Sequence, residues 1–235
     1  MRKWMIAAAL LAASFSDSQA QGVELSYGLK GGYGRSTMRA PRRADITNVS
    51  GYYTFNSEFY LDIAFTEHFS IQPGLGVTGR GAKINVLQEE ASTTTTFYKY
   101  QSNPIYLELP VNFIAKIPIG DIFDKCNVIL GGGPYVAYGI AGKQKVSGKF
   151  LGKSFSSEDN ITFSNDDQPV NSNNFYGEFK KFDFGLNAIA GLEYHWLTLN
   201  VGYAYGAVNI NPGANLSPID RVKNRSWYAS VGVKF

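Results

Sequence analysis

Eight segments of this chain alternate apolar residues with polar or small ones at a period of two, the pattern of β-strands with one apolar face. Each segment reaches the roughly 9–11 residues that a tilted membrane-spanning strand needs. Beyond the N-terminal region, no stretch approaches the roughly 18 consecutive apolar residues of a transmembrane helix. The remaining way to span a membrane is a closed barrel, because it satisfies every backbone polar group. The segments are Val23–Arg35, Tyr52–Phe65, Phe69–Lys83, Pro104–Lys116, Asn127–Ala141, Phe182–Tyr194, Leu197–Asn209 and Arg225–Phe235.

The connections between these segments alternate in length. The short ones are Thr66–His68, Ile117–Cys126 and His195–Trp196, and the long ones are Ser36–Gly51, Ile84–Asn103, Gly142–Lys181 and Ile210–Asn224. Outer-membrane barrels have short periplasmic turns and long external loops. The sequence therefore predicts an all-β fold, an eight-stranded antiparallel up-and-down transmembrane β-barrel with both ends at the periplasm.

The last strand, Arg225–Phe235, ends on a free aromatic residue. It resembles the closing strand of bacterial outer-membrane barrels, whose terminal aromatic residue is read by the barrel-assembly machinery. That resemblance implies an assembly signal formed by its apolar face, namely Trp227, Val231, Val233 and Phe235. We expect the strand to pair with Val23–Arg35, which removes both sheet edges, and to place Lys234 near Glu24.

The N-terminus carries the features of a secretory leader: Arg2-Lys3, an apolar run over Trp4–Ala13, and Ser18-Gln19-Ala20 before a cleavage site. We expect residues 1–20 to be a cleaved signal peptide for Sec-dependent export and residues 21–235 to be one barrel domain in the bacterial outer membrane. The mature net charge is then (22 − 2) − (19 − 1) = +2, which gives no reason to expect nucleic acid as a partner. Cys126 is the only cysteine, so no intrachain disulfide can form.

Several stretches resemble the PorT-like outer-membrane β-barrel family of Bacteroidetes. They are Tyr106-Leu-Glu-Leu-Pro110, Gly131-Gly-Gly-Pro134-Tyr135-Val-Ala-Tyr-Gly139, Asp183-Phe-Gly-Leu-Asn187 with Gly191-Leu-Glu193-Tyr194, and Gly202-Tyr-Ala-Tyr-Gly206 with Asn209-Ile210. Their order and spacing, from the fourth segment to the seventh, carry the resemblance. It implies a barrel in the outer membrane and, for some members, a link to protein secretion or gliding.

Ten charged residues fall on the inward registers of the predicted strands. They are Glu24, Lys30, Glu58, Asp62, Arg80, Glu108, Lys116, Asp183, Glu193 and Lys234. An eight-stranded barrel is just wide enough for side chains to fill it, and buried charges need partners. We therefore expect a salt-bridged lumen plug in three levels: Glu24, Asp62, Lys116, Glu193 and Lys234 low, Lys30, Glu58 and Glu108 in the middle, and Arg80 and Asp183 high. A narrow channel or a proton or small-ion path is the alternative function.

Catalysis has little support in the sequence. Barrels that act as lipid A deacylases or proteases use a histidine base near the outer rim, whereas His68 and His195 fall in the short, periplasmic turns. A lipid A-modifying enzyme is thus the least favoured alternative. No cluster of Cys and His has metal-ligand spacing, and the glycines of Gly131–Pro134 lack the Lys-Ser/Thr of a phosphate loop. We expect no catalytic residue, no metal and no cofactor.

Two long loops are candidate contact regions. Arg35, Arg39, Arg42 and Arg43 would lie at the level of lipopolysaccharide phosphates, which arginine binds well. Solvated loop charges are the slightly favoured alternative, because a charge run is usually a solvated face. The longest loop, Gly142–Lys181, is a candidate protein-binding element. Its strand-like fragments Lys149–Phe155 and Asn160–Phe163 would extend the barrel as a hairpin. Two functional classes remain open: a structural or interaction barrel, possible accessory of a secretion or surface complex, and a transport barrel.

Overall fold

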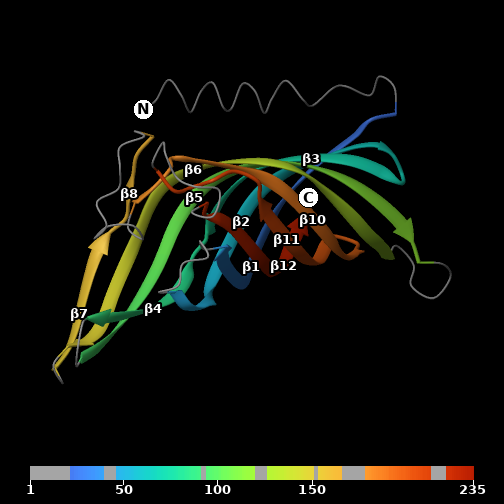
Figure 1. Ribbon diagram of the computed structural model, residues 1–235. Coiled ribbons are helices and arrows are strands. Elements are labelled where there is room, and N and C mark those ends of the chain that lie inside the picture. The colour runs from blue at the N-terminus through green and yellow to red at the C-terminus, as the bar shows by residue number, and fades with distance from the viewer. Residues whose placement is uncertain are drawn as a thin grey trace, which may run out of the picture.

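The computed structural model describes residues 22–39, 46–90, 94–119, 126–150, 153–165, 178–212 and 221–235. The predicted leader, residues 1–20, lies outside these ranges. The described chain is built of β-strands (Figure 1). They are β1 (Glu24–Arg39), β2 (Ile46–Thr66), β3 (Phe69–Gly79), β4 (Ala82–Glu90), β5 (Thr94–Pro118), β6 (Cys126–Phe150), β7 (Lys153–Asn160), β8 (Thr162–Phe163), β9 (Glu178–Phe179), β10 (Phe182–Tyr194), β11 (Leu197–Gly206) and β12 (Lys223–Lys234).

The strands close into a barrel whose ring follows the order β1, β2, β3, β5, β6, β10, β11, β12 and back to β1. Every neighbouring pair in the ring is antiparallel. The predicted eight-stranded up-and-down barrel is therefore confirmed. One end, here called the turn end, carries the tight β2–β3 and β10–β11 connections. The other, the hairpin end, carries β4, β7 and the extended parts of β5 and β6 (Figure 1).

The ring closes between its first and last strands, as the sequence predicts. Gly28 lies opposite Lys234, and Arg39 lies opposite Lys223. At the turn end, Phe235 N donates a hydrogen bond to Tyr27 O over 2.7 Å, and Tyr27 N donates to Phe235 O over 3.1 Å. The two rings also stack, with centroids 5.6 Å apart. The terminal residue thus forms the last rung of the closing ladder.

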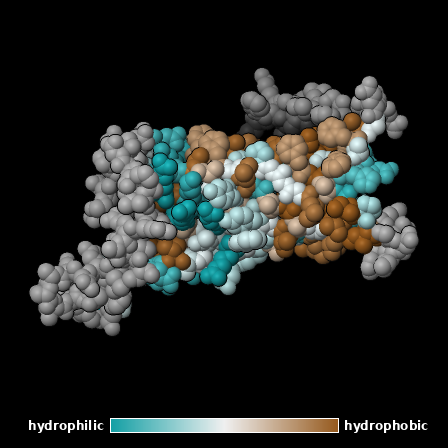
Figure 2. Space-filling model, turned by 45° about the vertical axis from the view of Figure 1, so that its right-hand side comes forward, coloured by the Kyte–Doolittle hydropathy of each residue, from teal (hydrophilic) through white to brown (hydrophobic). Residues whose placement is uncertain are grey.

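The outer wall is apolar, in agreement with the predicted alternation. Tyr33, Phe69, Leu186, Trp196, Trp227 and Phe235 are all more than half exposed. Figure 2 shows such side chains gathered on the barrel wall, with hydrophilic ones toward the hairpin end. Exposed apolar side chains over a whole barrel wall cost free energy in water but not in a lipid bilayer. The wall therefore faces hydrocarbon.

The strands reach well beyond the predicted boundaries at the hairpin end. Parts of the predicted loops Ser36–Gly51, Ile84–Asn103 and Gly142–Lys181 are strand, since β1, β2, β4, β5, β6 and β7 all enter them. Strand β7 pairs with β6 as a hairpin in the third of these loops. Its bounds, Lys153–Asn160, differ from those of the predicted fragments Lys149–Phe155 and Asn160–Phe163. Serine-, threonine- and lysine-rich stretches of this kind lack an apolar face, so periodicity alone did not reveal them; cross-strand pairing holds them extended.

The predicted third strand, Phe69–Lys83, is wrong as a single element because it divides into β3 and β4 at Arg80 and Gly81. The Arg80 N–H donates to Pro104 O over 2.8 Å, and Gly81 N–H donates to the Ser36 hydroxyl over 3.0 Å. A Cβ at Gly81 would collide with Ser102 O. The predicted seventh strand also ends early, at Gly206, because the Asn209 side chain accepts from Val222 N and turns the chain.

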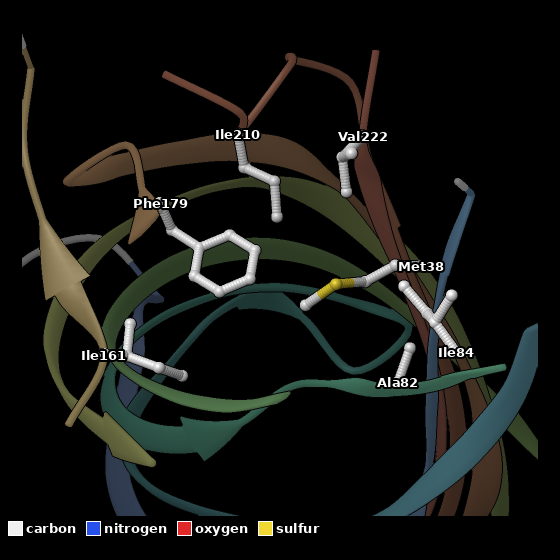
Figure 3. Packing of buried hydrophobic residues seen from close by; sticks show 7 residues of the cluster. All are labelled: Met38, Ala82, Ile84, Ile161, Phe179, Ile210 and Val222. Atoms are coloured by element: carbon white, nitrogen blue, oxygen red, sulfur yellow. The ribbon is translucent and has the colours of Figure 1, made fainter. Parts of the chain in front are cut away.

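An apolar cluster closes the lumen at the hairpin end, which the sequence did not predict. Strands β8 and β9 pair in parallel and fold over the opening, where Lys180 N donates to Ile210 O over 2.7 Å. The cluster consists of Met38, Ala82, Ile84, Ile161, Phe179, Ile210 and Val222, all of them buried (Figure 3). We call it the apolar lid. No helix among the described residues is long and apolar enough to cross a membrane.

Candidate functional site

The lumen holds its charges in layers, and the layer nearest the turn end is the most connected. The Lys116 ammonium lies 2.6 Å from the Asp62 carboxylate and 3.9 Å from Glu193. The Lys234 ammonium lies 2.8 Å from Glu193 and 3.8 Å from Asp62. Gln72 donates a further hydrogen bond to Asp62 over 3.1 Å. Two cations and two anions therefore neutralise one another, as buried charges require.

Glu24 does not belong to this layer. Glu24 is exposed at the opening of the lumen at the turn end, and it forms no ion pair with any described residue. Glu24 and Lys234 both line this opening, but the ion pair of Lys234 is with Glu193 and not with Glu24. The reason is the barrel stagger: Lys234 lies opposite Gly28, four residues further along β1 than Glu24.

The turn-end layer makes a graded stability prediction. Lys116→Met leaves Asp62 buried beside a more distant cation, and we expect it to lower the free energy of unfolding by about 3 to 5 kcal/mol. Lys234→Met should cost clearly less, because the Lys234 side chain is 18% exposed and Glu193 keeps Lys116 nearby. Urea unfolding in lipid vesicles measures both. Equal losses for the two variants would contradict the layer as described.

The middle layer is a single pair. The Lys30 ammonium lies 2.9 Å from Glu58, and it also lies 5.3 Å from the centre of the Tyr60 ring. Tyr60 fills the bore because Gly28, opposite it on β1, has no side chain; a Cβ there would overlap the ring. Gly202 makes room for Tyr228 in the same way. Glycines facing tyrosines thus let large rings fill a narrow lumen.

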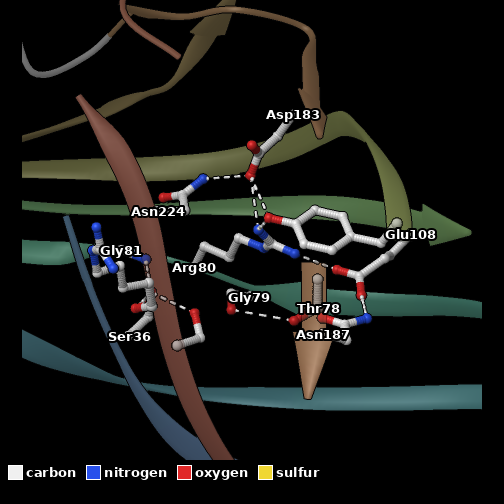
Figure 4. Close-up of polar contacts among 12 residues, drawn as sticks. Ser36, Thr78, Gly79, Arg80, Gly81, Glu108, Asp183, Asn187 and Asn224 are labelled. Carbon is white, nitrogen blue, oxygen red and sulfur yellow. Dashed lines mark hydrogen bonds and ion pairs between the residues drawn. The ribbon is translucent and has the colours of Figure 1, made fainter. Parts of the chain in front are cut away.

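The upper layer is centred on Arg80, whose side chain is 1% exposed. One guanidinium nitrogen lies 2.7 Å from Asp183 and 2.6 Å from the Tyr135 hydroxyl, and the other binds Glu108 (Figure 4). Glu108 was expected in the middle level with Lys30 and Glu58, and it is a partner of Arg80. One arginine therefore serves two carboxylates, for which its fixed fork of donors is suited.

Neutral side chains complete the upper layer, and sequence reasoning did not select them. Asn224 donates to Asp183 over 2.9 Å, and Asn187 approaches Glu108 at 3.5 Å. The Arg80 guanidinium also lies 4.4 Å from the centre of the Tyr135 ring. Tyr135 follows from alternation, because Val136 and Tyr138 face outward. Asn224 had no comparable signal, since it precedes the predicted start of the last strand.

Little space remains between these layers. A cavity of about 20 Å³ lies between Glu58, Arg80, Glu108 and Tyr228, enough for about one water molecule. Above the upper layer, the apolar lid covers the bore, and the Phe163 ring packs against Tyr106 with centroids 5.7 Å apart. Among the described residues, the lumen is therefore filled from Lys116 to the lid.

The other predicted residues lie outside the lumen. Trp227, Val231 and Val233 face outward on β12, and so does Phe235 directly after it. Arg35 and Arg39 are exposed on β1; Arg42 and Arg43 lie outside the described residues. His68 and His195 are exposed at the turn end, and the His195 ring contacts Tyr194 at 4.6 Å. Within the described part of the chain, no three His, Cys, Asp or Glu side chains gather as metal ligands.

The extended hairpin carries one close ion pair away from the barrel. The Lys143 ammonium donates to Glu158 over 2.6 Å across β6 and β7. This hydrogen bond and the charge attraction raise the pKa of Lys143 and lower the pKa of Glu158. Both side chains are well exposed, so the pair orients the hairpin surface and adds little stability.

An apolar wall around a charged, filled bore defines a small integral outer-membrane β-barrel. The family model described as "Outer membrane protein beta-barrel domain" matches residues 16–210. This chain belongs to that family, and it is an integral protein of the outer membrane. No curated protein sequence matches the chain.

Solved outer-membrane barrels show similarity at low identity. The attachment invasion locus protein Ail of Yersinia pestis is 18% identical, with a TM-score of 0.34, over 90% of this chain and 99% of that one. Neisserial surface protein A is 12% identical, with a TM-score of 0.38 and the same coverage. The outer membrane protein OprG of Pseudomonas aeruginosa is 12% identical, with a TM-score of 0.36, over 89% of this chain and 95% of that one.

Proposed function

We propose that this chain is a non-conducting outer-membrane barrel that acts as a structural and interaction protein. The filled lumen carries the proposal: three charged layers and the apolar lid leave a cavity for about one water. A conducting pore needs a continuous aqueous path, which larger barrels provide. In this proposal residues 1–20 are the cleaved leader, residues 21–235 form the barrel, the long hairpins face outward, and the protein is not an enzyme.

Planar-bilayer recording tests the plug directly. We expect no steady conductance from the purified barrel, because the charged layers and the lid block the bore. Glu58→Gln and Glu108→Gln alter the lumen without changing its size, so they should leave the recording silent. A steady open pore whose conductance changes with either substitution would support the alternative, a narrow channel or small-ion transport barrel.

The extended sheet supports the interaction role. Strand β7 ends the sheet order, so among the described strands it pairs with β6 alone, and all its residues are exposed. An unpaired strand edge is a surface that a partner strand can extend. We therefore propose that the binding site for a protein partner lies within Gly142–Lys181. The PorT-like resemblance favours a partner that is a component of a secretion or surface complex. The barrel-assembly machinery is the second partner, through Trp227, Val231, Val233 and Phe235.

Co-purification from mild detergent tests the partner. We expect a stoichiometric companion protein with the intact chain. Val146 and Ser157 are cross-strand neighbours, so replacing residues 147–156 by an Asn-Gly turn shortens the hairpin without changing its register. That variant should lose the companion and keep its folded, heat-modifiable barrel. A barrel that purifies alone before and after the change would contradict the interaction role.

A further inference from the structure

Four cations gather on the outer wall where β1 meets β12. Arg39 lies directly opposite Lys223, and Arg35 and Arg225 are diagonal neighbours, because Arg35 lies opposite Trp227 and Thr37 lies opposite Arg225. Diagonal neighbours are roughly 7–8 Å apart, within reach of long side chains. We call these four residues the cationic seam. The described parts of residues 27–57, 199–212 and 221–235 contain no outward-facing Asp or Glu.

Such a cluster is suited to binding an anion. Like charges directly opposite each other in a sheet are destabilising, and no described carboxylate offsets these four. Arg225 is held in place, since it donates to the Tyr203 hydroxyl over 3.0 Å and lies 4.4 Å from the centre of the Tyr205 ring. That leaves further guanidinium donors for a ligand, and planar guanidinium groups bind phosphate oxygens in pairs.

An apolar groove with a volume of about 540 Å³ lies on the same wall toward the turn end. It crosses β1, β12, β11 and β10, and its outward lining includes Gly31, Ala229, Val231, Leu199, Val201 and Ala190. Trp227 and Tyr203 lie between the groove and the cationic seam, with ring centroids 4.5 Å apart. We call this pair the aromatic collar. Ala229 lies four residues from Arg225 along β12, about 13 Å at the rise of a strand. Cations, aromatic collar and groove therefore follow one line along the wall.

We propose that the β1–β12 wall binds one phosphate-bearing acyl lipid of the outer leaflet. The phosphate lies on the cationic seam, and one acyl chain lies in the groove below the collar. This proposal rests on the orientation given under the proposed function, with the hairpin end facing outward. The sequence predicted that Arg35, Arg39, Arg42 and Arg43 contact lipopolysaccharide phosphates from a loop, whereas the site proposed here is shared between β1 and β12. An apolar membrane-spanning protein segment would fill the groove but bring no anion to the seam.

Trp227 is a built-in reporter for this lipid, because its ring stands at the collar and is 64% exposed. With Trp4 and Trp196 replaced by Phe, it is the only indole of the chain. The folded barrel in micelles is titrated with phosphatidic acid carrying brominated acyl chains, and separately with phosphatidylcholine carrying the same chains. We expect quenching to saturate near one lipid per barrel and at about tenfold lower concentration for phosphatidic acid, since one charge-assisted hydrogen bond corresponds to roughly that factor.

Two variants separate the parts of the site. Arg35→Gln with Arg225→Gln should abolish the preference for phosphatidic acid. Gly31→Leu keeps every charge but fills the groove, and it is tolerated because a Cβ there meets only Asn56 O, at 3.9 Å; it should weaken phosphatidic acid binding several-fold. The matched control is Lys99→Gln with Lys145→Gln, which removes the same charge from exposed positions on β5 and β6 and should change nothing.

Three results would overturn the proposal. The first is an equal loss of preference in the seam variant and in the control variant, which would indicate general surface charge. The second is displacement of the brominated lipid by inorganic phosphate at similar concentration, which would indicate a free-anion site. The third is a native mass of two chains without bound lipid, which would indicate that a second copy covers the wall. The lipid titration measures neither conductance through the lumen nor co-purification through the hairpin. A negative result here therefore leaves the proposed function untouched, and the reverse also holds.

Discussion

Replacing Arg80 by Met is expected to lower the free energy of unfolding by about 3 to 5 kcal/mol, the usual effect of removing one partner from a buried ion pair. Arg80 is the shared partner of Glu108 and Asp183, and Asp183 has no exposed surface. Without the guanidinium, two carboxylates remain in a narrow bore with only Asn and Tyr donors near them. Urea unfolding in vesicles, followed by tryptophan fluorescence and heat-modifiable migration, measures the loss.

The triple variant Arg80→Met, Glu108→Gln and Asp183→Asn is the informative companion. It removes all three charges together, and neutral replacements of a complete buried ionic group are often close to neutral in stability. We therefore expect most of the loss to be recovered. Lys143→Met is the matched control, because it breaks an exposed Lys–Glu pair and should leave unfolding unchanged. A single Arg80 variant as stable as this control would contradict the central role of the upper layer.

Deleting Phe235 is expected to impair barrel assembly while leaving export intact. The deletion removes both hydrogen bonds between Phe235 and Tyr27 and the stacking of their rings. Two backbone hydrogen bonds contribute about 1 to 3 kcal/mol together, and the aromatic pair about 0.5 to 1.5 kcal/mol. All of this is lost at the closing rung, where the ring is completed. The yield of heat-modifiable barrel in outer-membrane fractions measures the defect, and the amount of processed periplasmic chain measures export.

Phe65→Ala provides the comparison for this deletion. Phe65 is an exposed aromatic residue near the same end, half of its surface exposed, but it lies on β2, away from the closing pair. Its loss should weaken membrane anchoring slightly and leave assembly near normal. Normal barrel yield after the Phe235 deletion, or an equal defect in Phe65→Ala, would count against a special role for the terminal residue.

The period-two pattern was sufficient for the ring, because lipid requires an apolar outward face at every membrane-spanning position. Strands such as Phe182–Tyr194 were predicted with the boundaries that β10 has. The pattern gave no signal where neither face of a strand is apolar, as in Lys153–Asn160. It also gave none where an apolar residue points inward, as do the lid residues Met38 and Ile161. Inward apolar positions near strand ends were the available signal for the lid.

Where a strand has one apolar face, the sequence by itself determined which face of the barrel its residues occupy, because that choice depends on local alternation. It placed Glu58, Asp62, Arg80, Glu108 and Asp183 inside before any partner was known. Only the tertiary structure decided the partners: Glu108 of the predicted middle level binds Arg80, Lys234 binds Glu193, and Arg225 joins Arg35 on the outer wall. The physical reason is that pairing register and barrel stagger set the depth of each side chain, and ring closure brings together the two ends of the chain.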